Sequence, residues 1–259
     1  MSRTWDLLRQ SGWERDHPEL DVIPVETAQI PRSSRIVVHD DPRGPCADRF
    51  RLLRLRLQDR WNAETLKTLL ITSPLPGDGK STVALNLACA LAEQGKRNVL
   101  LIGGDLYHAT LAERLGISEG HGLAECIENG LKPFSVIRRL EPLGWYLLPA
   151  GKARGNPTEL LQSTGFAEIR RDLCQHFEWI LIDSPPVLPL ADVLALRQQS
   201  DASIMVVRAG RTPADSVEQA IERLGRKHVL GMVLNGIDGF DKAYAKYYRA
   251  YDVDASPGK

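Results

Sequence analysis

The residues of this chain best suited to chemistry form a glycine-rich segment, 73–82, which reads Ser-Pro-Leu-Pro-Gly-Asp-Gly-Lys-Ser-Thr. Glycines at 77 and 79 let successive backbone N–H groups turn inward as a nest for an anion, and the dipole of a following helix favours negative charge there. The Lys80 ammonium then reaches the β- and γ-phosphates, and the Ser81 hydroxyl ligates Mg²⁺. The segment predicts binding of a nucleoside triphosphate with Mg²⁺ by Pro76, Gly77, Asp78, Gly79, Lys80, Ser81 and Thr82.

The residues on either side agree with a phosphate-binding loop. An apolar run, Leu69–Ile71, precedes the segment, and a helical stretch rich in alanine and leucine follows it from Val83 to Glu93. The usual pattern has glycine at position 74, where this chain has proline, so the Gly-Lys-Ser part is complete and the opening glycine is missing. The alternative, a glycine turn with a chance lysine, does not account for the strand before the segment and the helix after it.

A carboxylate for the metal follows later in the chain. Asp183 ends the apolar run Trp179–Asp183 and is followed by Ser-Pro-Pro. A P-loop enzyme holds Mg²⁺ through a carboxylate from such a position. A strand-terminal aspartate on its own is usually a turn residue, and the upstream Gly-Lys-Ser changes that interpretation to a metal ligand.

Two further polar residues end predicted strands. Asp105 follows the run from Asn98 to Ile102, and it is a candidate both for the metal and for catalysis together with Lys80; the N-cap of a helix starting near Tyr107 is an equally good explanation. Asn235 closes the last apolar run and can offer its amide to the nucleotide base, or it can simply form a turn.

Tyrosines gather near position 250. Four of the six lie at Tyr244, Tyr247, Tyr248 and Tyr251, interleaved with lysine and arginine. We interpret them as a cluster of phosphate acceptors in a solvated tail, since each phosphotyrosine adds about −1.5 to −2 charges to a locally basic segment. An amphipathic final helix, with Tyr244, Tyr248 and Tyr251 on one packed face, is the alternative.

Composition narrows the class of protein. Lys plus Arg and Asp plus Glu number 33 each in 259 residues, so no net field attracts nucleic acid, and we expect no nucleic-acid partner. Apolar runs are too short for a membrane span, and the first residues do not resemble a signal peptide, so we expect a cytoplasmic protein. The four cysteines are widely spaced with no Cys-x-x-Cys pair, which suggests neither a zinc nor an iron–sulfur site.

Strand and helix patterns alternate through most of the chain. We expect strands at 68–72, 98–102, 145–148, 179–183, 203–207 and 229–234, and helices at 80–94, 108–115, 165–176, 190–199 and 213–226. Strict alternation of this kind predicts an α/β fold with a doubly wound, mainly parallel sheet flanked by helices. We expect a flexible or docking arm at 1–45, a P-loop kinase or ATPase domain at 46–240 that begins with an arginine-rich helix at 47–61, and a tyrosine-rich tail at 241–259.

Taken in order, these motifs resemble the bacterial tyrosine kinases of capsule and exopolysaccharide synthesis, which belong to the P-loop ATPases. The resemblance covers about residues 33–251 and rests on the phosphate loop 76–82, Leu148–Gly151 with Asn156-Pro157 and Glu159-Leu-Leu161, Ile182–Val187, Gly231–Asn235 and the tyrosines. It implies a homo-oligomeric ring in which one subunit's tail is phosphorylated in a neighbour's site. It also implies a membrane-anchored polysaccharide co-polymerase, or chain-length regulator, that recruits the protein to the inner face of the membrane.

Two motifs depart from the family pattern. The family's oligomerisation helix carries Glu-x-x-Arg-x-x-Arg, and here Asp48, Arg51 and Arg54 occupy those places with a shorter acid. The family's second acidic motif is Asp-x-Asp-x-Arg, in which the resemblance assigns the first aspartate to activating the tyrosine hydroxyl. Here Gly103 replaces that aspartate and Tyr107 replaces the arginine, so loss of a general base worth about 10²–10⁴-fold is expected.

Three hypotheses follow. The first is a Mg·ATP-dependent tyrosine autokinase that phosphorylates its own tail and regulates polysaccharide synthesis and export. The second is an ATP-binding scaffold of the same system in which phosphoryl transfer is weak or absent. The third is a partition or septum-positioning ATPase, which shares the fold; its relatives carry an early lysine in the phosphate loop where this chain has Leu75, and this argues against it. We favour the first.

Overall fold

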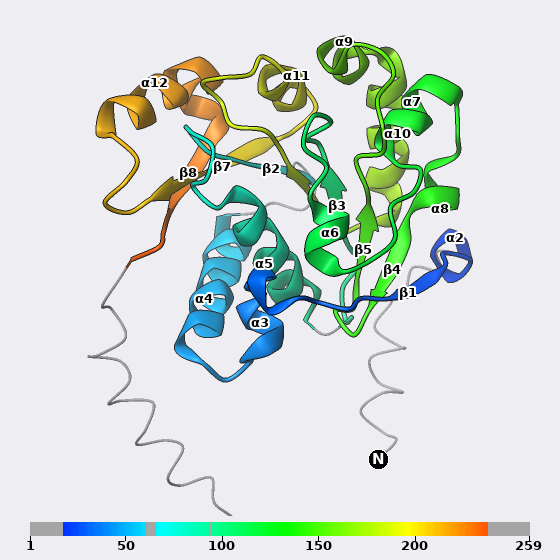
Figure 1. Cartoon of the computed structure of the whole chain (residues 1–259), viewed down its shortest axis with the longest axis horizontal. Helices are drawn as coiled ribbons and strands as arrows, with labels where there is room; N and C mark the ends of the chain where they lie inside the picture. The colour runs from blue at the N-terminus through cyan, green and yellow to red at the C-terminus, as the bar shows by residue number, and fades with distance from the viewer. Residues whose placement is uncertain (1–17, 61–65, 94, 238–259) are drawn as a thin grey trace, which may run out of the picture.

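The computed structural model describes residues 18–60, 66–93 and 95–237. A single sheet of eight strands runs through this part of the chain in the order β1-β4-β5-β3-β6-β2-β7-β8 (Figure 1). Neighbouring strands are parallel except β4 and β5, which are antiparallel and joined by the short turn 142–144. The expected doubly wound, mainly parallel sheet is confirmed.

All six predicted strands are present within one residue at each end, and two more flank them. The strands are β1 (Val25–Thr27), β2 (Thr68–Thr72), β3 (Val99–Gly103), β4 (Arg138–Glu141), β5 (Trp145–Leu148), β6 (Trp179–Asp183), β7 (Ala202–Arg208) and β8 (Val229–Asn235). Every residue of β2, β3, β5 and β6 is buried, as expected for central strands covered on both faces. The sequence missed β1 and β4 because they read Val-Glu-Thr and Arg-Arg-Leu-Glu, which contain no apolar run.

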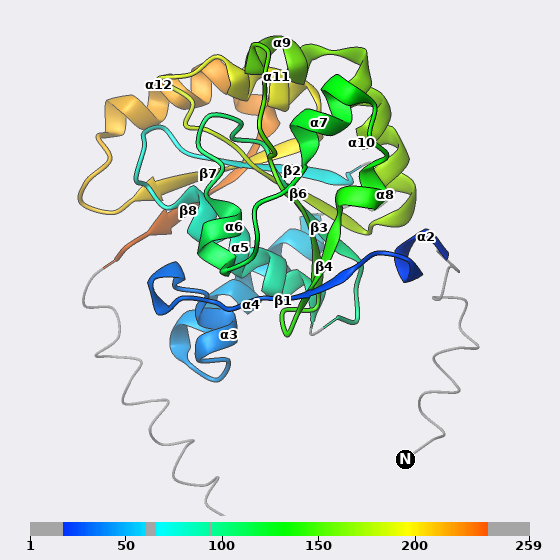
Figure 2. The same ribbon diagram turned by 45° about the vertical axis from the view of Figure 1, so that its right-hand side comes forward.

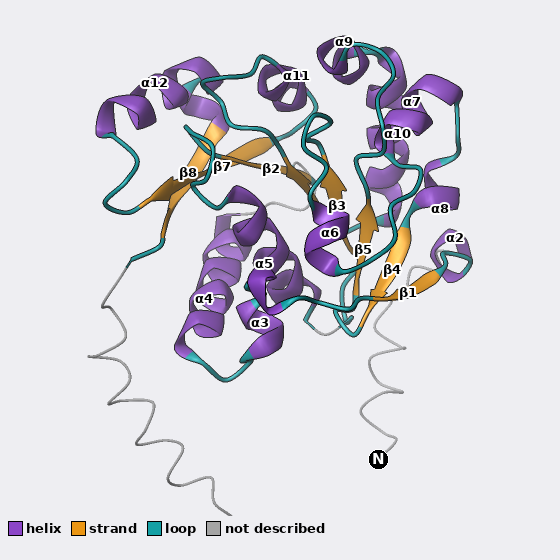
Figure 3. Cartoon of the chain, in the orientation of Figure 1, coloured by secondary structure: helices purple, strands orange, loops and turns teal. Residues whose placement is uncertain are grey.

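Helices cover both faces of the sheet (Figure 2; Figure 3). One core packs the sheet against α7, α9, α10, α11 and α12, and the other packs it against α4, α5 and α6. In chain order, the α-helices (α) and 3₁₀ helices (η) of the described residues are α2 (Pro18–Asp21), η1 (Arg32–Ser34), α3 (Val37–Asp40), α4 (Pro45–Arg60), α5 (Lys80–Ala92), α6 (Leu111–Leu115), α7 (Leu123–Asn129), α8 (Pro133–Val136), α9 (Pro157–Gln162), α10 (Thr164–His176), α11 (Asp192–Gln198), α12 (Ala214–Leu224) and η2 (Arg226–His228).

Helix α5 positions the phosphate loop. Its alanines and leucines are buried on almost every side because the sheet lies on one flank and α4 packs on another. It begins at Lys80, directly after Gly79, whose φ of 97° lies in the left-handed region. The chain therefore turns sharply out of β2 and enters α5 with its first N–H groups facing the loop.

Part of the expected arm is folded into the domain. Within the described range 18–45, β1 pairs in parallel with β4, and Ile36 is fully buried. Asn86 of α5 accepts a hydrogen bond from the Val38 N–H at 3.1 Å and donates one to the Arg35 carbonyl at 2.8 Å. Residues 18–45 are thus folded and not flexible, because isolated apolar residues anchor the segment without any periodic pattern. A docking role for the arm stays a prediction, and residues 1–17 lie outside the description.

Within the described ranges, no helix is both long enough and apolar enough to cross a membrane.

Candidate functional site

The phosphate loop, residues 73–82, has a conformation that requires glycine at two positions. Gly77 and Gly79 have φ values of 84° and 97°, in the region that other residues rarely adopt. A Cβ atom on Gly79 would also lie 2.1 Å from the side-chain nitrogen of Asn235. Both glycines that the motif predicted are therefore required by the backbone.

Asp78 braces this loop from inside. Its carboxylate is 3% exposed and accepts hydrogen bonds from the Leu75 N–H at 3.1 Å and the Thr212 hydroxyl at 2.7 Å. The Asn235 amide donates to the Asp78 carbonyl at 2.9 Å, and Arg208 donates to the Gly77 carbonyl at 3.3 Å. In this structure the side chains of Asp78 and Asn235 support the loop, and their contact with a nucleotide remains a prediction.

No sequence pattern indicates Thr212 or Arg208, which lie about 130 residues from the loop they contact. Both belong to β7 or the turn that follows it. The sheet places β7 beside β2, so the carboxyl end of β7 reaches the loop that leaves β2. Only the strand order could have indicated these contacts.

The acidic residues Asp105 and Asp183 meet at the carboxyl ends of β3 and β6, which are adjacent in the sheet. They are 7% and 3% exposed. Asp105 Oδ2 lies 3.9 Å from Lys80 Nζ, and Asp105 Oδ1 accepts a hydrogen bond from the His108 N–H at 2.9 Å. Helix α6 starts only at Leu111, so Asp105 caps the turn before it and is not its N-cap.

Asp183 is a buried acid with spare bonding capacity. Burial raises its pKa from the ordinary 3.8 to about 6; the Lys80 charge opposes the rise, and the nearby Asp105 carboxylate adds to it. Its Oδ1 atom is buried and has no hydrogen-bond partner among the described residues. A buried carboxylate oxygen without a partner is costly unless a cation binds it.

These residues fit a magnesium ion that is held jointly with a nucleotide. The described residues contain no group of three or more His, Cys, Asp and Glu side chains able to hold a metal by themselves. Mg²⁺ commonly binds one or two protein oxygens together with phosphate oxygens, and here Asp183 and Ser81 would supply the protein oxygens, with Asp105 beside them. The unsatisfied Asp183 oxygen is the observation that supports this fit.

Arg114 of α6 is a cation at this site that sequence analysis missed. Its Nη1 donates to the Thr82 hydroxyl at 3.3 Å, and its charge favours the ionised form of Asp183. The pattern around it, Leu-Ala-Glu-Arg-Leu, reads as an ordinary surface helix.

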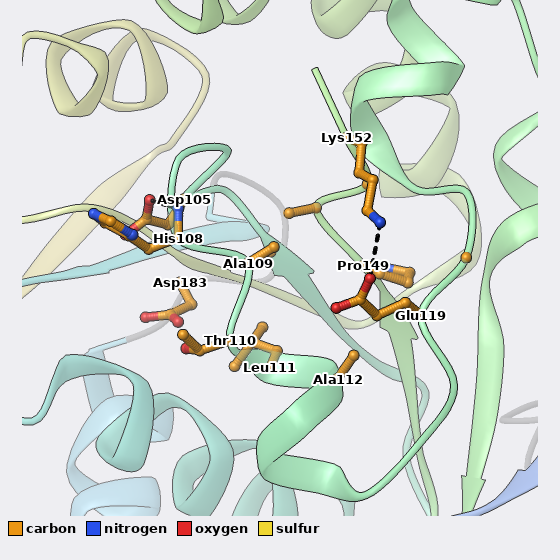
Figure 4. Close-up of a pocket in the computed structure, with 14 residues that line it drawn as sticks. Asp105, His108, Ala109, Thr110, Leu111, Ala112, Glu119, Pro149, Lys152 and Asp183 are labelled. Atoms are coloured by element: carbon orange, nitrogen blue, oxygen red, sulfur yellow. Dashed lines mark hydrogen bonds and ion pairs between the residues drawn. The ribbon is translucent and has the colours of Figure 1, made fainter. Parts of the chain in front are cut away.

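A pocket opens beside the two acids (Figure 4). Asp105, His108 and Asp183 lie on one side of it, and Glu119 and Lys152 lie on the other, where their side chains form an ion pair of 3.0 Å. Ala109, Leu111, Pro149 and Ala150 contribute apolar surface between them. The pocket therefore joins an apolar slot, suited to a side chain, to the carboxylates next to the phosphate loop.

Gly103 lies in the wall of this pocket, paired in register with Asp183. A Cβ atom at Gly103 would lie 2.8 Å from the Ala150 backbone nitrogen and 3.3 Å from the Ala150 Cβ. The backbone at 149–151 thus occupies the space that a side chain at position 103 would need.

The remaining predicted residues fall in two places. Asp48, Arg51 and Arg54 lie on α4, where Arg51 Nη1 contacts Asp48 Oδ1 at 2.5 Å and Arg54 contacts Glu93 at 3.1 Å. These are contacts within one chain, and a role in oligomerisation stays a prediction. Tyr244, Tyr247, Tyr248 and Tyr251 lie outside the described residues.

Comparisons with known proteins agree on one kind of relative. A family model described as "Cellulose biosynthesis protein BcsQ" matches residues 67–230. The tyrosine-protein kinase YwqD of Bacillus subtilis is 29% identical over 203 residues, 78% of this chain and 85% of the relative. The tyrosine-protein kinase CpsD of Streptococcus pneumoniae serotype 4 is 31% identical over 183 residues, 68% of this chain and 79% of the relative.

Longer relatives and solved structures extend the likeness. The succinoglycan biosynthesis transport protein ExoP of Rhizobium meliloti is 32% identical over 86% of this chain, which spans only 30% of that relative. The kinase domain of the Escherichia coli tyrosine kinase ETK superposes with a TM-score of 0.75 and 27% identity, with 85% of each chain covered.

Proposed function

The chain belongs to the bacterial tyrosine-protein kinases of the P-loop class, and from this premise we propose that it transfers the γ-phosphoryl group of ATP to tyrosine side chains. The acceptors are its own Tyr244, Tyr247, Tyr248 and Tyr251. Phosphorylation occurs between subunits of a homo-oligomer, and Asp48, Arg51 and Arg54 lie at the interface. Membership of the tyrosine-protein kinases argues against the third hypothesis, a partition or septum-positioning ATPase.

The site divides the work among a few residues. The loop N–H groups and the N-terminus of α5 bind the phosphates, and Lys80 stabilises the charge that develops on the transferred group. Ser81, Asp105 and Asp183 would hold Mg²⁺, which when bound neutralises charge on the phosphate oxygens. Asp78, braced by Thr212, keeps the loop in its binding shape before the nucleotide arrives.

The observation that carries this proposal is the pocket next to the acids. A plain nucleotide switch needs no slot for a second side chain at the γ-phosphate end of the loop. Here Ala109, Leu111 and Pro149 line such a slot, and Asp105 and Asp183 stand on its wall. A phenol ring is mostly apolar with one polar tip. The slot therefore suits a tyrosine whose ring lies along the apolar wall and whose hydroxyl points toward the two acids.

The position of Gly103 favours a second candidate, an ATP-binding scaffold with little or no transfer. No carboxylate can stand at 103 without moving the 149–151 backbone, so the hydroxyl of an acceptor lacks the base that the family resemblance assigns there. Phosphoryl transfer depends chiefly on positioning and charge stabilisation, so we favour a slow kinase over an inactive one.

A mixing experiment tests transfer between subunits. One variant carries Lys80→Met and intact tyrosines, and the other carries Tyr→Phe at 244, 247, 248 and 251 with an intact loop. We expect neither variant alone to incorporate phosphate from labelled ATP and the mixture to do so. Label confined to the variant with intact Lys80, or absent from the mixture while wild type is labelled, would contradict transfer in trans.

We further propose that this reaction regulates the synthesis and export of an exopolysaccharide or capsule through a membrane-anchored co-polymerase that recruits the protein to the cytoplasmic face of the membrane. ExoP is a succinoglycan biosynthesis transport protein and the matching family is one of cellulose biosynthesis proteins, and both likenesses support the proposal. Replacing the chain by its Lys80→Met variant in the cell should alter polymer amount or length. Unchanged polymer would contradict a regulatory role.

A further inference from the structure

The side chains Lys80, Asp105 and Asp183 beside the phosphate loop do not neutralise the negative charge of Mg·ATP. Lys80 faces two buried carboxylates, Asp105 and Asp183, so these three side chains together are negative when ionised. Mg·ATP is itself an anion, and like charges at this range repel. The helix dipole and the loop N–H groups offset part of this repulsion, and a further cation on the γ-phosphate side would offset more.

Arg114 is placed to supply that cation. Helix α6 lies beside the start of α5 in both views, and Arg114 reaches across to the Thr82 hydroxyl, one residue beyond the Mg²⁺ ligand Ser81 (Figure 1; Figure 2). Its charge also acts on Asp183. These two neighbours place the guanidinium on the metal side of the loop. Asn235 and Arg208 contact a different part of the loop, the carbonyls of Asp78 and Gly77.

The Arg114 guanidinium is held in position, and most of its N–H donors remain available for a ligand. The Ser34 hydroxyl donates to the Arg114 carbonyl, and Ser34 is 2% exposed, so η1 fixes the turn of α6 that carries Arg114. Arg114 itself is only half-buried. An arginine has five N–H donors in a planar fork that matches phosphate oxygens, and the bond to Thr82 uses one of them.

We propose that Arg114 binds the γ-phosphate of ATP and thereby makes the site prefer ATP to ADP. The proposal rests on the proposed function for its ligand. It also explains why 32–36 fold against α5 and α6: this segment sets the position of a residue that contacts the nucleotide.

Calorimetric titration of the protein with Mg·ATP and Mg·ADP tests the inference without using catalysis. For Arg114→Met, we expect ATP affinity to fall about tenfold or more while ADP affinity changes less than about twofold, because hydrogen bonds between charged groups contribute more to binding than neutral ones. Arg226→Met is the matched control, because Arg226 lies in η2, which precedes β8 and so lies at the opposite end of the parallel strands from the loop, and its guanidinium contacts Glu218 at 3.1 Å. It should leave both affinities unchanged.

Two more variants separate charge from support of the loop. Arg114→Gln keeps an amide donor but removes the charge and the guanidinium fork, so it should lose the preference for ATP even if Arg114→Met folds poorly. Thr82→Val removes the bond partner and should alter the ATP and ADP affinities together. Equal losses for ATP and ADP in Arg114→Gln, or no loss at all, would overturn the inference. Failure of the wild type to bind ATP would instead overturn the proposed function.

Discussion

The phosphate loop and the pocket beside it meet at Asp183 but are held in different ways. The loop is fixed by partly buried hydrogen bonds: the Asp78 carboxylate accepts from the Leu75 N–H and the Thr212 hydroxyl, and the Asn235 amide donates to the Asp78 carbonyl. The pocket is formed by Asp183 and three separate stretches, 103–112, 119–120 and 149–152, and its far side carries an exposed ion pair. The loop, the proposed nucleotide half of the site, is therefore braced before binding, whereas the pocket, the proposed acceptor half, carries an exposed ion pair at its rim. This difference suits a loop that binds a nucleotide tightly and a pocket that an acceptor side chain enters and leaves.

Asp183 belongs to both halves, and its replacement should have the largest effect. Asp183→Asn should lower Mg²⁺-dependent transfer by at least about 10²-fold, because the Mg²⁺ ligand loses its charge. The same change should stabilise the nucleotide-free protein at pH 8 by up to about 3 kcal/mol, because it removes a buried charge. The pKa of Asp183 is raised by roughly two units, and each unit corresponds to about 1.4 kcal/mol. Denaturant unfolding and phosphate incorporation measure the two effects, and loss of both activity and stability would contradict this account.

The raised pKa of Asp183 also predicts a dependence on pH. Because the folded pKa of about 6 exceeds the ordinary 3.8, this group favours folding below pH 4, and that contribution is lost as the pH rises through 6. Binding of Mg·ATP should follow the opposite course, weakening below pH 6 as a proton competes with the ion. Titrations between pH 5 and 8 measure this, and Asp183→Asn should flatten the stability change.

Asp78 tests whether the loop is braced before binding. Asp78→Ala removes two buried hydrogen bonds and leaves the Leu75 N–H without its partner, which should cost about 2–4 kcal/mol of unfolding free energy. ATP affinity should fall about tenfold because the free loop then samples other shapes. Asp215→Ala, at an exposed position in the first turn of α12, is the control and should change stability by less than about 1 kcal/mol. Equal behaviour of the two variants would mean that Asp78 does not brace the loop.

Gly103 tests the pocket wall. Gly103→Asp should destabilise the protein by about 1–3 kcal/mol, because its Cβ would lie 2.8 Å from the Ala150 nitrogen. Gly103→Ala should show a similar loss, since both share the Cβ. We expect the aspartate variant to increase transfer over the alanine variant only if the 149–151 backbone moves aside. Unchanged stability in both variants would show that the 149–151 backbone moves aside at little cost in free energy.

The ion pair at the rim should have the smallest effect on stability. Glu119 and Lys152 are 71% and 80% exposed, and such pairs contribute less than about 1 kcal/mol. Lys152→Ala should therefore leave the melting temperature almost unchanged. A large loss of stability would show that the acceptor half is held as firmly as the loop.

The phosphate loop and the central strands could be predicted because neighbouring residues specify them. Gly77, Gly79 and Lys80 form one contiguous motif, and the central strands are apolar on both faces. Thr212 and Arg114 could not be found in this way, since each joins the site through the order of strands or the packing of a helix. The same reason explains the misjudged segment 18–45, where Ile36 and Ser34 are buried by tertiary contacts that leave no periodic signature.

The central claim is that this chain phosphorylates its own tyrosines, and one measurement tests it most directly. Purified protein, first treated with a phosphatase, is incubated with Mg·ATP beside its Lys80→Met variant, and residues 241–259 are examined by mass spectrometry. The account predicts phosphate on Tyr244, Tyr247, Tyr248 or Tyr251 in the wild type alone. Absence of phosphate from wild-type protein that demonstrably binds ATP would contradict it and favour the scaffold.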